Sequence, residues 1–186
     1  MRYLLPLLFF AISGCSTVMD LTRNEPIETN PAERSLGARI DDSRLNTIIT
    51  VNINAAHPDL DTAHVKVDVF NGVVLLSGEV PTEQLRTLAG DTARDVAYVR
   101  QVHNELNVRP NSSILSRMND SYLHSRIKLR LLSEEILQGT NIDVIVVDGT
   151  AFMMGLVSAE QAEVAGHVTS LISGIRRVVK VFEYVD

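Results

Sequence analysis

The chain has 186 residues, of which 45% are hydrophobic and 22% are charged, and its formal net charge at pH 7 is −6. This composition excludes an intrinsically disordered chain, and the acidic balance argues against general nucleic-acid binding, which needs a basic surface. A single cysteine, Cys15, excludes an intramolecular disulfide.

The N-terminus has the pattern of a lipoprotein signal peptide. Arg2 gives a short positive region, and the apolar run over residues 4–12 is too short to span a bilayer. Residues 12–15 (Ile-Ser-Gly-Cys) resemble a bacterial lipobox, in which small residues precede the cleaved bond and the cysteine. This resemblance implies that residues 1–14 are removed and that Cys15 is acylated, which would anchor the mature chain in a membrane.

Residues 15–40 are expected to form the acylated cysteine and an extended tether, because prolines, asparagines and mixed charges punctuate this stretch. In enteric-type sorting, an aspartate after the acylated cysteine retains a lipoprotein in the inner membrane. Ser16 at that position therefore resembles an outer-membrane address, with the body facing the periplasm. For residues 34–40, an irregular segment packed on the body is the alternative.

The rest of the chain is expected to consist of two copies of one module, over residues 41–109 and 118–186, joined by a linker at 110–117. Asp42 recurs as Asp120, 78 residues later, and the glycine pair at 72 and 78 recurs 77 residues later at 149 and 155. An internal repeat of this kind predicts two copies of one structural unit.

Each copy is expected to begin with a helix, because Leu45, Ile49 and Ile53 are four residues apart, as are their counterparts at 123, 127 and 131. The helix starts are predicted to be capped by Asp41, Asp42 or Ser43 in the first copy, and by Asn119, Asp120 or Ser121 in the second.

A hairpin follows in each copy, turning at Asn71-Gly72 and at Asp148-Gly149. A second helix and a last strand complete the module. The order helix, strand, strand, helix, strand predicts an α+β fold with two helices packed on a three-stranded mixed sheet. In the second copy, Ile145 and Val147 replace Asp68 and Phe70. Its back face is therefore expected to be covered by the first copy or by another subunit.

This order, together with the glycines, resembles the BON domain, although Tyr98 stands where that family usually has glycine. With the lipobox and the segments 34–37 and 152–157, the chain resembles the dual BON-domain outer-membrane lipoproteins of the DolP (YraP) type. The resemblance implies binding of anionic phospholipid through the first helix of the second copy. It also implies a role in outer-membrane integrity and enrichment at the cell-division site. The glycines that carry the resemblance are Gly72, Gly78, Gly149, Gly155 and Gly174.

The first helix of the second copy carries basic residues that the first copy lacks. Tyr122, Arg126 and Arg130 form one stripe beside the core face, and Lys128 lies elsewhere on the same helix. Anionic headgroups attract each basic side chain by about 1 kcal/mol near the surface, and a tyrosine ring suits the headgroup boundary. Leu129 and Leu132 are expected to add shallow apolar contact. The residues predicted to bind phospholipid are Tyr122, Arg126, Lys128, Leu129 and Arg130.

No catalytic residue, metal ligand or cofactor is expected, because the five histidines are scattered and no serine lies in a nucleophile-elbow pattern. Three alternatives to lipid binding stay open. The basic helix face could be solvated and paired with nearby carboxylates. The two modules could form an adaptor for envelope assembly proteins, or the chain could be a passive spacer.

Overall fold

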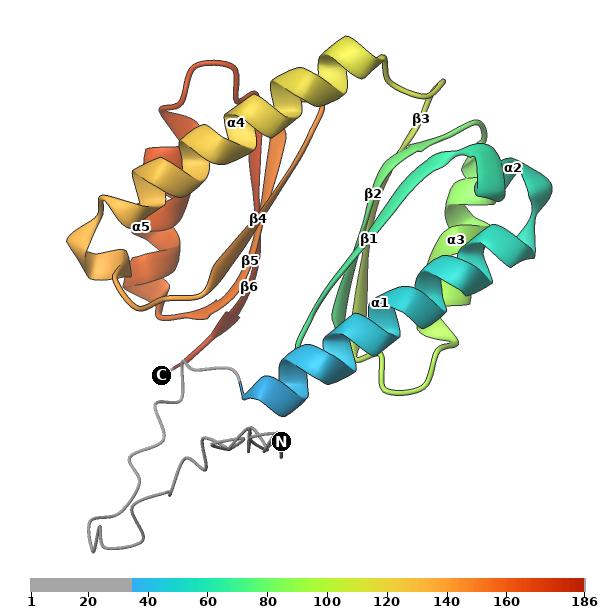
Figure 1. Cartoon of the computed structure of the whole chain (residues 1–186), viewed down its shortest axis with the longest axis horizontal. Coiled ribbons are helices and arrows are strands. Elements are labelled where there is room, and N and C mark those ends of the chain that lie inside the picture. The colour runs from blue at the N-terminus through green and yellow to red at the C-terminus, as the bar shows by residue number, and fades with distance from the viewer. Residues whose placement is uncertain (1–34, 186) are drawn as a thin grey trace, which may run out of the picture.

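The computed structural model describes residues 35–185, in which the two modules stand side by side (Figure 1). The expected signal peptide, Cys15 and the tether up to residue 34 lie outside the described residues. Within the described part of the chain, no helix has the length and apolar character needed to cross a bilayer.

The first module has the expected order of elements and one short additional helix. Its sheet has the strand order β1-β2-β3, with β1 antiparallel and β3 parallel to the central strand β2. In chain order the elements are α1 (Leu36–Ala56), α2 (Pro58–Thr62), β1 (His64–Phe70), β2 (Val73–Val80), α3 (Glu83–Arg94) and β3 (Gln101–Val108).

The second module repeats this arrangement, with a 3-10 turn in place of the short helix. Its strand order is β4-β5-β6, again with one antiparallel and one parallel pairing. The predicted α+β fold with tandem units is therefore confirmed. In chain order the elements are α4 (Ile114–Leu132), η1 (Glu135–Leu137), β4 (Ile142–Val147), β5 (Thr150–Val157), α5 (Ala159–Ser170) and β6 (Arg177–Tyr184).

Both first helices begin earlier than the sequence indicated. The hydroxyl of Ser35 accepts a hydrogen bond from the backbone N–H of Ala38 at 3.1 Å and caps α1. Ser113 caps α4 in the same way, through the N–H of Ser116 at 3.2 Å. The last residues of the expected tether and of the expected linker are therefore helical.

Asp42 and Asp120, which were expected as possible caps of these helices, instead bind the hairpin turns. Asp42 is buried, and its two carboxylate oxygens accept hydrogen bonds from the backbone N–H groups of Asn71 and Gly72, at 2.8 and 2.9 Å. Asp120 accepts the equivalent bonds from residues 148 and 149, at 2.8 and 3.0 Å. The cap assignment was wrong for both aspartates, because each one fastens the hairpin turn of its module to the first helix.

The hairpin turns form where the dipeptides predicted them. Asn71 and Gly72 have φ angles of 51° and 74°, and Asp148 and Gly149 have 47° and 67°. Two successive positive φ angles are the mark of a type I′ turn, which favours Asn-Gly and Asp-Gly.

The glycines in the second strands mark close approaches between neighbouring strands. A Cβ atom on Gly78 would lie 1.9 Å from the carbonyl oxygen of His64, and one on Gly155 would lie 2.9 Å from that of Asn141. Both glycines lie inside their strands, Gly78 in β2 and Gly155 in β5.

Each module has one apolar core between its sheet and its own helices. In the first module, Ile49 and Ile53 of α1 pack with Leu76 of β2 and Ala89 of α3. In the second module, Ile127 of α4 packs with Met153 of β5 and with residues 162 and 165 of α5. The helices thus cover one face of each sheet, as the sequence predicted.

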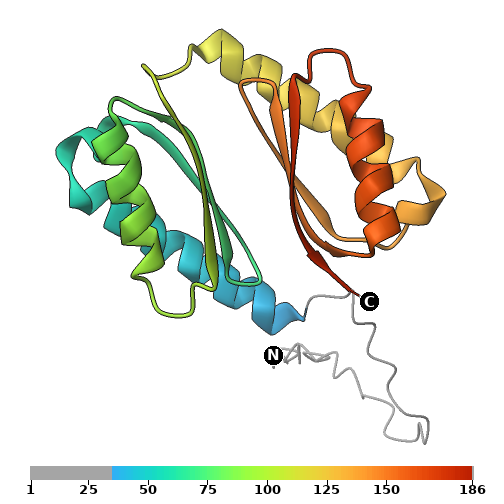
Figure 2. The ribbon, with the colours of Figure 1, turned by 180° about the vertical axis from the view of Figure 1, so that it is seen from behind.

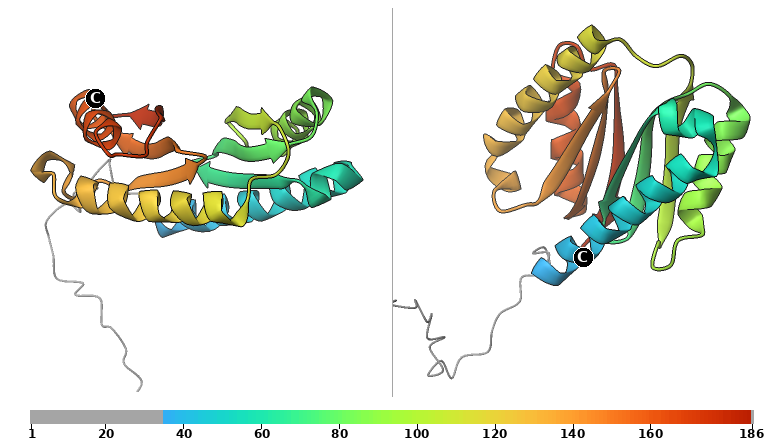
Figure 3. Two further views of the ribbon diagram at one scale, coloured as in Figure 1. Left: turned by 90° about the horizontal axis from the view of Figure 1, so that it is seen from above. Right: turned by 45° about the vertical axis from the view of Figure 1, so that its right-hand side comes forward.

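The other faces of the two sheets pack against each other, with the helices on the outside (Figures 2 and 3). We call this third core the interdomain seam. In the structure the first module covers the back face of the second module. The buried residues of the seam are Phe70, Val73, Leu75, Ile145, Val147, Phe152, Met154 and Val181.

An ion-pair network joins the two modules beside the seam. Arg109, which follows β3, lies 2.8 Å from Glu79 of its own sheet and 2.6 Å from Asp148 in the other module's hairpin turn. Burial alone would raise the pKa of Glu79, but hydrogen bonds from Arg109, His64 and the Ser112 backbone outweigh it, so the pKa is lowered. Glu79 is therefore a buried anion that ties the chain after β3 to its own sheet.

A second set of polar contacts links the last strand to the first module. Glu183 in β6 accepts a hydrogen bond from the side chain of Asn71 at 3.1 Å and pairs with Arg100 at 2.6 Å. Arg177 pairs with Glu105 at 3.1 Å. Each hairpin turn is thus tied to the opposite module.

The positive φ angle of Tyr98 is expected to strain the backbone of the first module. Tyr98 is 89% exposed and has a φ of 72°, whereas the matching residue of the second module is Gly174. We expect Tyr98→Gly to raise the free energy of unfolding by about 1 kcal/mol in urea titrations, because glycine adopts this conformation without steric cost.

Two control variants separate the effect of the backbone conformation from the effect of removing the tyrosine ring. Tyr98→Ala keeps the strain and should give no gain, whereas Gly174→Ala should destabilise, because its Cβ would lie 2.9 Å from Leu123 Cδ2. A loss of stability in Tyr98→Gly would contradict the strain argument.

Candidate functional site

Helix α4 presents three faces to its surroundings. Leu123, Ile127 and Leu131 are buried in the core of the second module. His124 and Lys128 line a groove between the modules. The third face points away from the protein, and we call it the outward face of α4.

The outward face of α4 is apolar over most of the helix length. Its exposed residues recur at spacings of three, four or seven, which places them on one side of the helix. Leu115 is 76% exposed and Leu129 is 69% exposed. Leu115, Met118 and Tyr122 line one shallow depression at the start of the helix. The large exposed apolar residues of α4 are Ile114, Leu115, Met118, Tyr122, Leu129 and Leu132.

Three of the predicted binding residues lie on this surface. Tyr122, Arg126 and Leu129 are exposed, and the guanidinium of Arg126 lies 5.7 Å from the centre of the Tyr122 ring. Among the described residues, no carboxylate forms a salt bridge with Arg126. Its charge is therefore available at the middle of the apolar surface.

Arg130 and Lys128 are placed differently. Arg130 is exposed but pairs with Glu134, one turn further along the chain, at 2.7 Å. Lys128 is half-buried, and its ammonium group donates a hydrogen bond to the carbonyl of Ile142 at 2.8 Å. Lys128 does not lie on the outward face, because its position on the helix turns it toward the edge of β4.

Sequence reasoning missed the first half of this surface. Ile114, Leu115 and Met118 lie at the start of α4, in or beside the segment that was assigned to the linker. The spacing from Leu115 through Met118 to Tyr122 was visible in the sequence. Recognising Ser113 as the helix cap would have revealed it.

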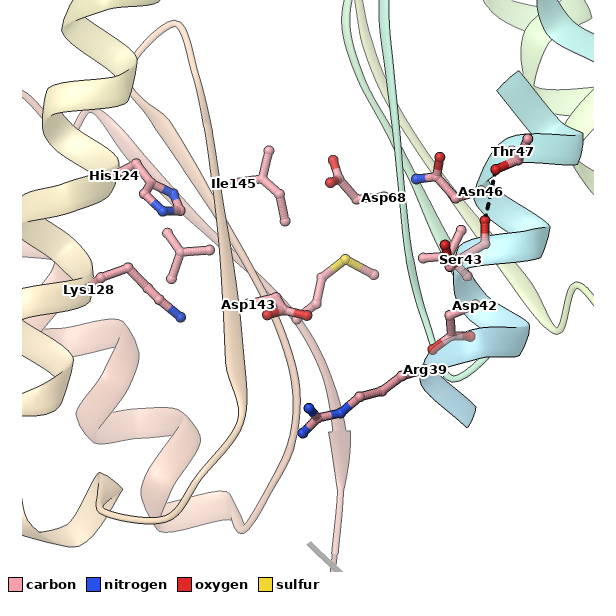
Figure 4. A pocket seen from close by; sticks show the side chains of 13 residues that line it. Arg39, Asp42, Ser43, Asn46, Thr47, Asp68, His124, Lys128, Asp143 and Ile145 are labelled. Carbon is pink, nitrogen blue, oxygen red and sulfur yellow. Dashed lines mark hydrogen bonds between the residues drawn. The ribbon is translucent and has the colours of Figure 1, made fainter. Parts of the chain in front are cut away.

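The groove between the modules lies beside α1 and α4 and has a volume of about 740 Å³. Figure 4 shows His124 and Lys128 reaching into it from α4, with Asp68 and Asp143 between the helices. Burial raises the pKa of Asp68, the charge of Lys66 opposes this rise, and the charge of Asp143 adds to it. One carboxylate oxygen of Asp68 is buried and, within residues 35–185, has no hydrogen-bond partner. The groove thus holds a carboxyl group whose ionisation is unfavourable in the folded protein.

A metal site is not formed by the described residues, because no three of their His, Cys, Asp or Glu side chains converge in a suitable way.

Both modules match one known family. The family model for the BON domain matches residues 41–110 and 119–186. The chain belongs to the BON-domain family. The two matches correspond to the two modules, so α4 is the first helix of the second BON domain.

Relatives with similar sequences cover most of the chain. Outer membrane lipoprotein DolP of Haemophilus influenzae is 34% identical over 163 residues, which are 86% of this chain and 82% of that protein. The 21 kDa hemolysin of Actinobacillus pleuropneumoniae is 29% identical, covering 88% and 85%. Osmotically-inducible protein Y of Escherichia coli is 28% identical, covering 77% and 72%. These findings confirm the resemblance to dual BON-domain proteins of the DolP type, and none of the three names describes an enzyme.

Asp68 predicts a pH-dependent stability. The pKa of Asp68 is higher in the folded than in the unfolded protein. Its contribution to the free energy of unfolding is therefore fully present at a pH below 3.8, the ordinary pKa, and is lost as the pH rises through the raised pKa. We expect Asp68→Asn to raise the free energy of unfolding at pH 7 by on the order of 1 kcal/mol. The gain should vanish toward pH 3 in urea titrations.

Asp61→Asn is the control, because Asp61 is exposed on α2. Equal pH profiles for Asp68→Asn and the natural chain would show that burial of this carboxyl has no energetic consequence.

Proposed function

We propose that this protein is an outer-membrane lipoprotein that binds anionic phospholipid through the outward face of α4. The outer-membrane location follows the name of the Haemophilus influenzae relative. The lipobox at residues 12–15 would supply the anchor through acylation of Cys15, and its acyl chains would hold the body on the periplasmic side.

The observation that carries the proposal is an apolar helix face with an uncompensated cation at its centre. Soluble domains rarely leave so many large apolar side chains on one helix face in water unless that face meets a partner. At a bilayer surface, Leu129 and Leu132 can enter the acyl boundary while Arg126 stays among the headgroups. An amphipathic helix that lies in the interface has this division of side chains.

The attraction has two parts. Each basic residue near an anionic surface contributes about 1 kcal/mol. Full burial of a leucine side chain contributes roughly 1.5–3 kcal/mol, and shallow insertion gains a fraction of it. The site is therefore weak alone, and an acylated Cys15 would strengthen it by keeping the local concentration of lipid high.

Two rival interpretations lose support. A protein-binding adaptor could have used the apolar back face of the second BON domain, but the first domain covers that face in the seam. A solvated basic face needs nearby carboxylates. Glu134 provides one for Arg130, but within residues 35–185 no carboxylate forms a salt bridge with Arg126.

The resemblance to DolP-type lipoproteins extends the proposal to cell physiology. The protein would support outer-membrane integrity and gather at the division site. Envelope assembly proteins stay predicted partners, since a surface-bound lipoprotein can meet them there.

Vesicle co-sedimentation of residues 16–186, which include every described helix and strand, tests the proposal. We expect retention on phosphatidylglycerol-containing vesicles, little on phosphatidylcholine vesicles, and weakening with salt. Arg126→Gln should weaken binding about fivefold, and Leu129→Glu about tenfold or more.

Lys128→Gln is the matched control, because it removes the same charge from the same helix but from the groove side. It should change binding less than about twofold. Equal binding to neutral and anionic vesicles, or no effect of Arg126→Gln and Leu129→Glu, would overturn the proposal.

A further inference from the structure

We infer that α1, the first helix of the first BON domain, is a second membrane contact, so that the protein rests on the bilayer with two helices. This inference rests on the proposed function and extends it to a surface outside the second domain. Sequence reasoning set α1 aside because it lacks the basic residues of α4.

The exposed side of α1 carries apolar residues opposite its core face. Ile40 is 61% exposed and Val51 is 59% exposed, and Leu36 is also exposed. Spacings of four and eleven place these three residues on one side of the helix. The row from Ile40 to Val51 extends about 17 Å along the helix, given a rise of 1.5 Å per residue.

Helices α1 and α4 lie on the same side of the molecule. In Figure 1 both are in front of the sheets, and Figure 2 shows α3 and α5 in front when the view is reversed. The view from above in Figure 3 shows α1 and α4 together along one edge of the molecule. Both helices also line the groove, α1 through Ser43 and Thr47 and α4 through His124 and Lys128.

The third face of each helix therefore lies on the side of the molecule that α1 and α4 share. Each helix uses one face for its own core and a second face for the shared groove. The remaining face is apolar in both, so a flat bilayer on this side would meet Val51 and Leu129 together. The interdomain seam holds the two faces in this arrangement.

One basic residue of α1 lies beside its apolar row. Arg44 is exposed and occupies the position that matches Tyr122 of α4, 78 residues later, whereas Arg39 lines the groove. Of the two aspartates, Asp42 is turned inward to the hairpin turn, and Asp41 lies about a quarter turn from Ile40.

The predicted anchor joins the body at this helix. Twenty residues along the chain separate Cys15 from Ser35, which caps α1 (35 − 15). A chain of that length reaches at most about 70 Å and has a root-mean-square span of about 25 Å when flexible. The start of α1, with Leu36 and Ile40, is therefore the part of the body that the anchor holds closest to the bilayer.

Site-specific fluorescence tests this arrangement. Residues 16–186 contain no cysteine, so single cysteines at Ile40, Val51, Leu129 or Leu171 can each carry an environment-sensitive NBD label. On addition of phosphatidylglycerol-containing vesicles, we expect a blue shift and an increase of about twofold or more in emission at positions 40, 51 and 129. Leu171, which is exposed at the end of α5 on the opposite side, should not respond.

The outcomes separate this inference from the proposed function. A response at 129 without one at 40 and 51 would overturn the α1 contact and leave lipid binding by α4 intact. No response at any position, with no co-sedimentation, would overturn both.

A charge insertion gives a second readout. Ile40→Glu combined with Val51→Glu should weaken vesicle binding about tenfold, whereas Leu171→Glu should have no effect. Unchanged binding of the double variant would also overturn the α1 contact.

Discussion

The two sheets turn their helix-free faces toward each other, and Phe70 and Leu75 of one module pack with Phe152 and Met154 of the other. Either module alone would expose the apolar residues of its helix-free face to water. Full burial of one large apolar side chain contributes roughly 1.5–3 kcal/mol, which is a considerable fraction of the 5–15 kcal/mol that stabilises a typical domain. The seam therefore joins the two small domains through a shared apolar core. Their first helices face the same side because of it.

The two modules keep the same construction and differ at the surface. Asp42 and Asp120 fasten their hairpin turns with equivalent hydrogen bonds. The exposed helix faces differ between the modules: α4 carries Tyr122 and Arg126, and α1 carries Arg44 in a row of apolar residues. A duplicated module can preserve its folding contacts and still vary the residues that meet a partner, because the two sets lie on different faces of the same helix.

The sequence predicted the fold well because its strongest patterns are local. Four-residue spacings gave the core faces of the helices, and Asn71-Gly72 and Asp148-Gly149 gave the hairpin turns. The aspartates were misread because a helix cap and a long-range hydrogen bond to a turn look the same in sequence. Lys128 was predicted to bind lipid although it lies off the stripe of Tyr122 and Arg126, because the sequence does not show that the edge of β4 lies beside it.

The orientation of the protein on a bilayer is the central claim, and NMR with paramagnetic lipid measures it most directly. Residues 16–186 would be bound to anionic nanodiscs that contain a spin-labelled lipid, and signal loss would be read at each backbone amide. The account predicts the greatest loss along α4 near Met118 and Leu129, and no loss along α3 and α5. Greatest loss along α3 or α5, with α4 unaffected, would contradict it.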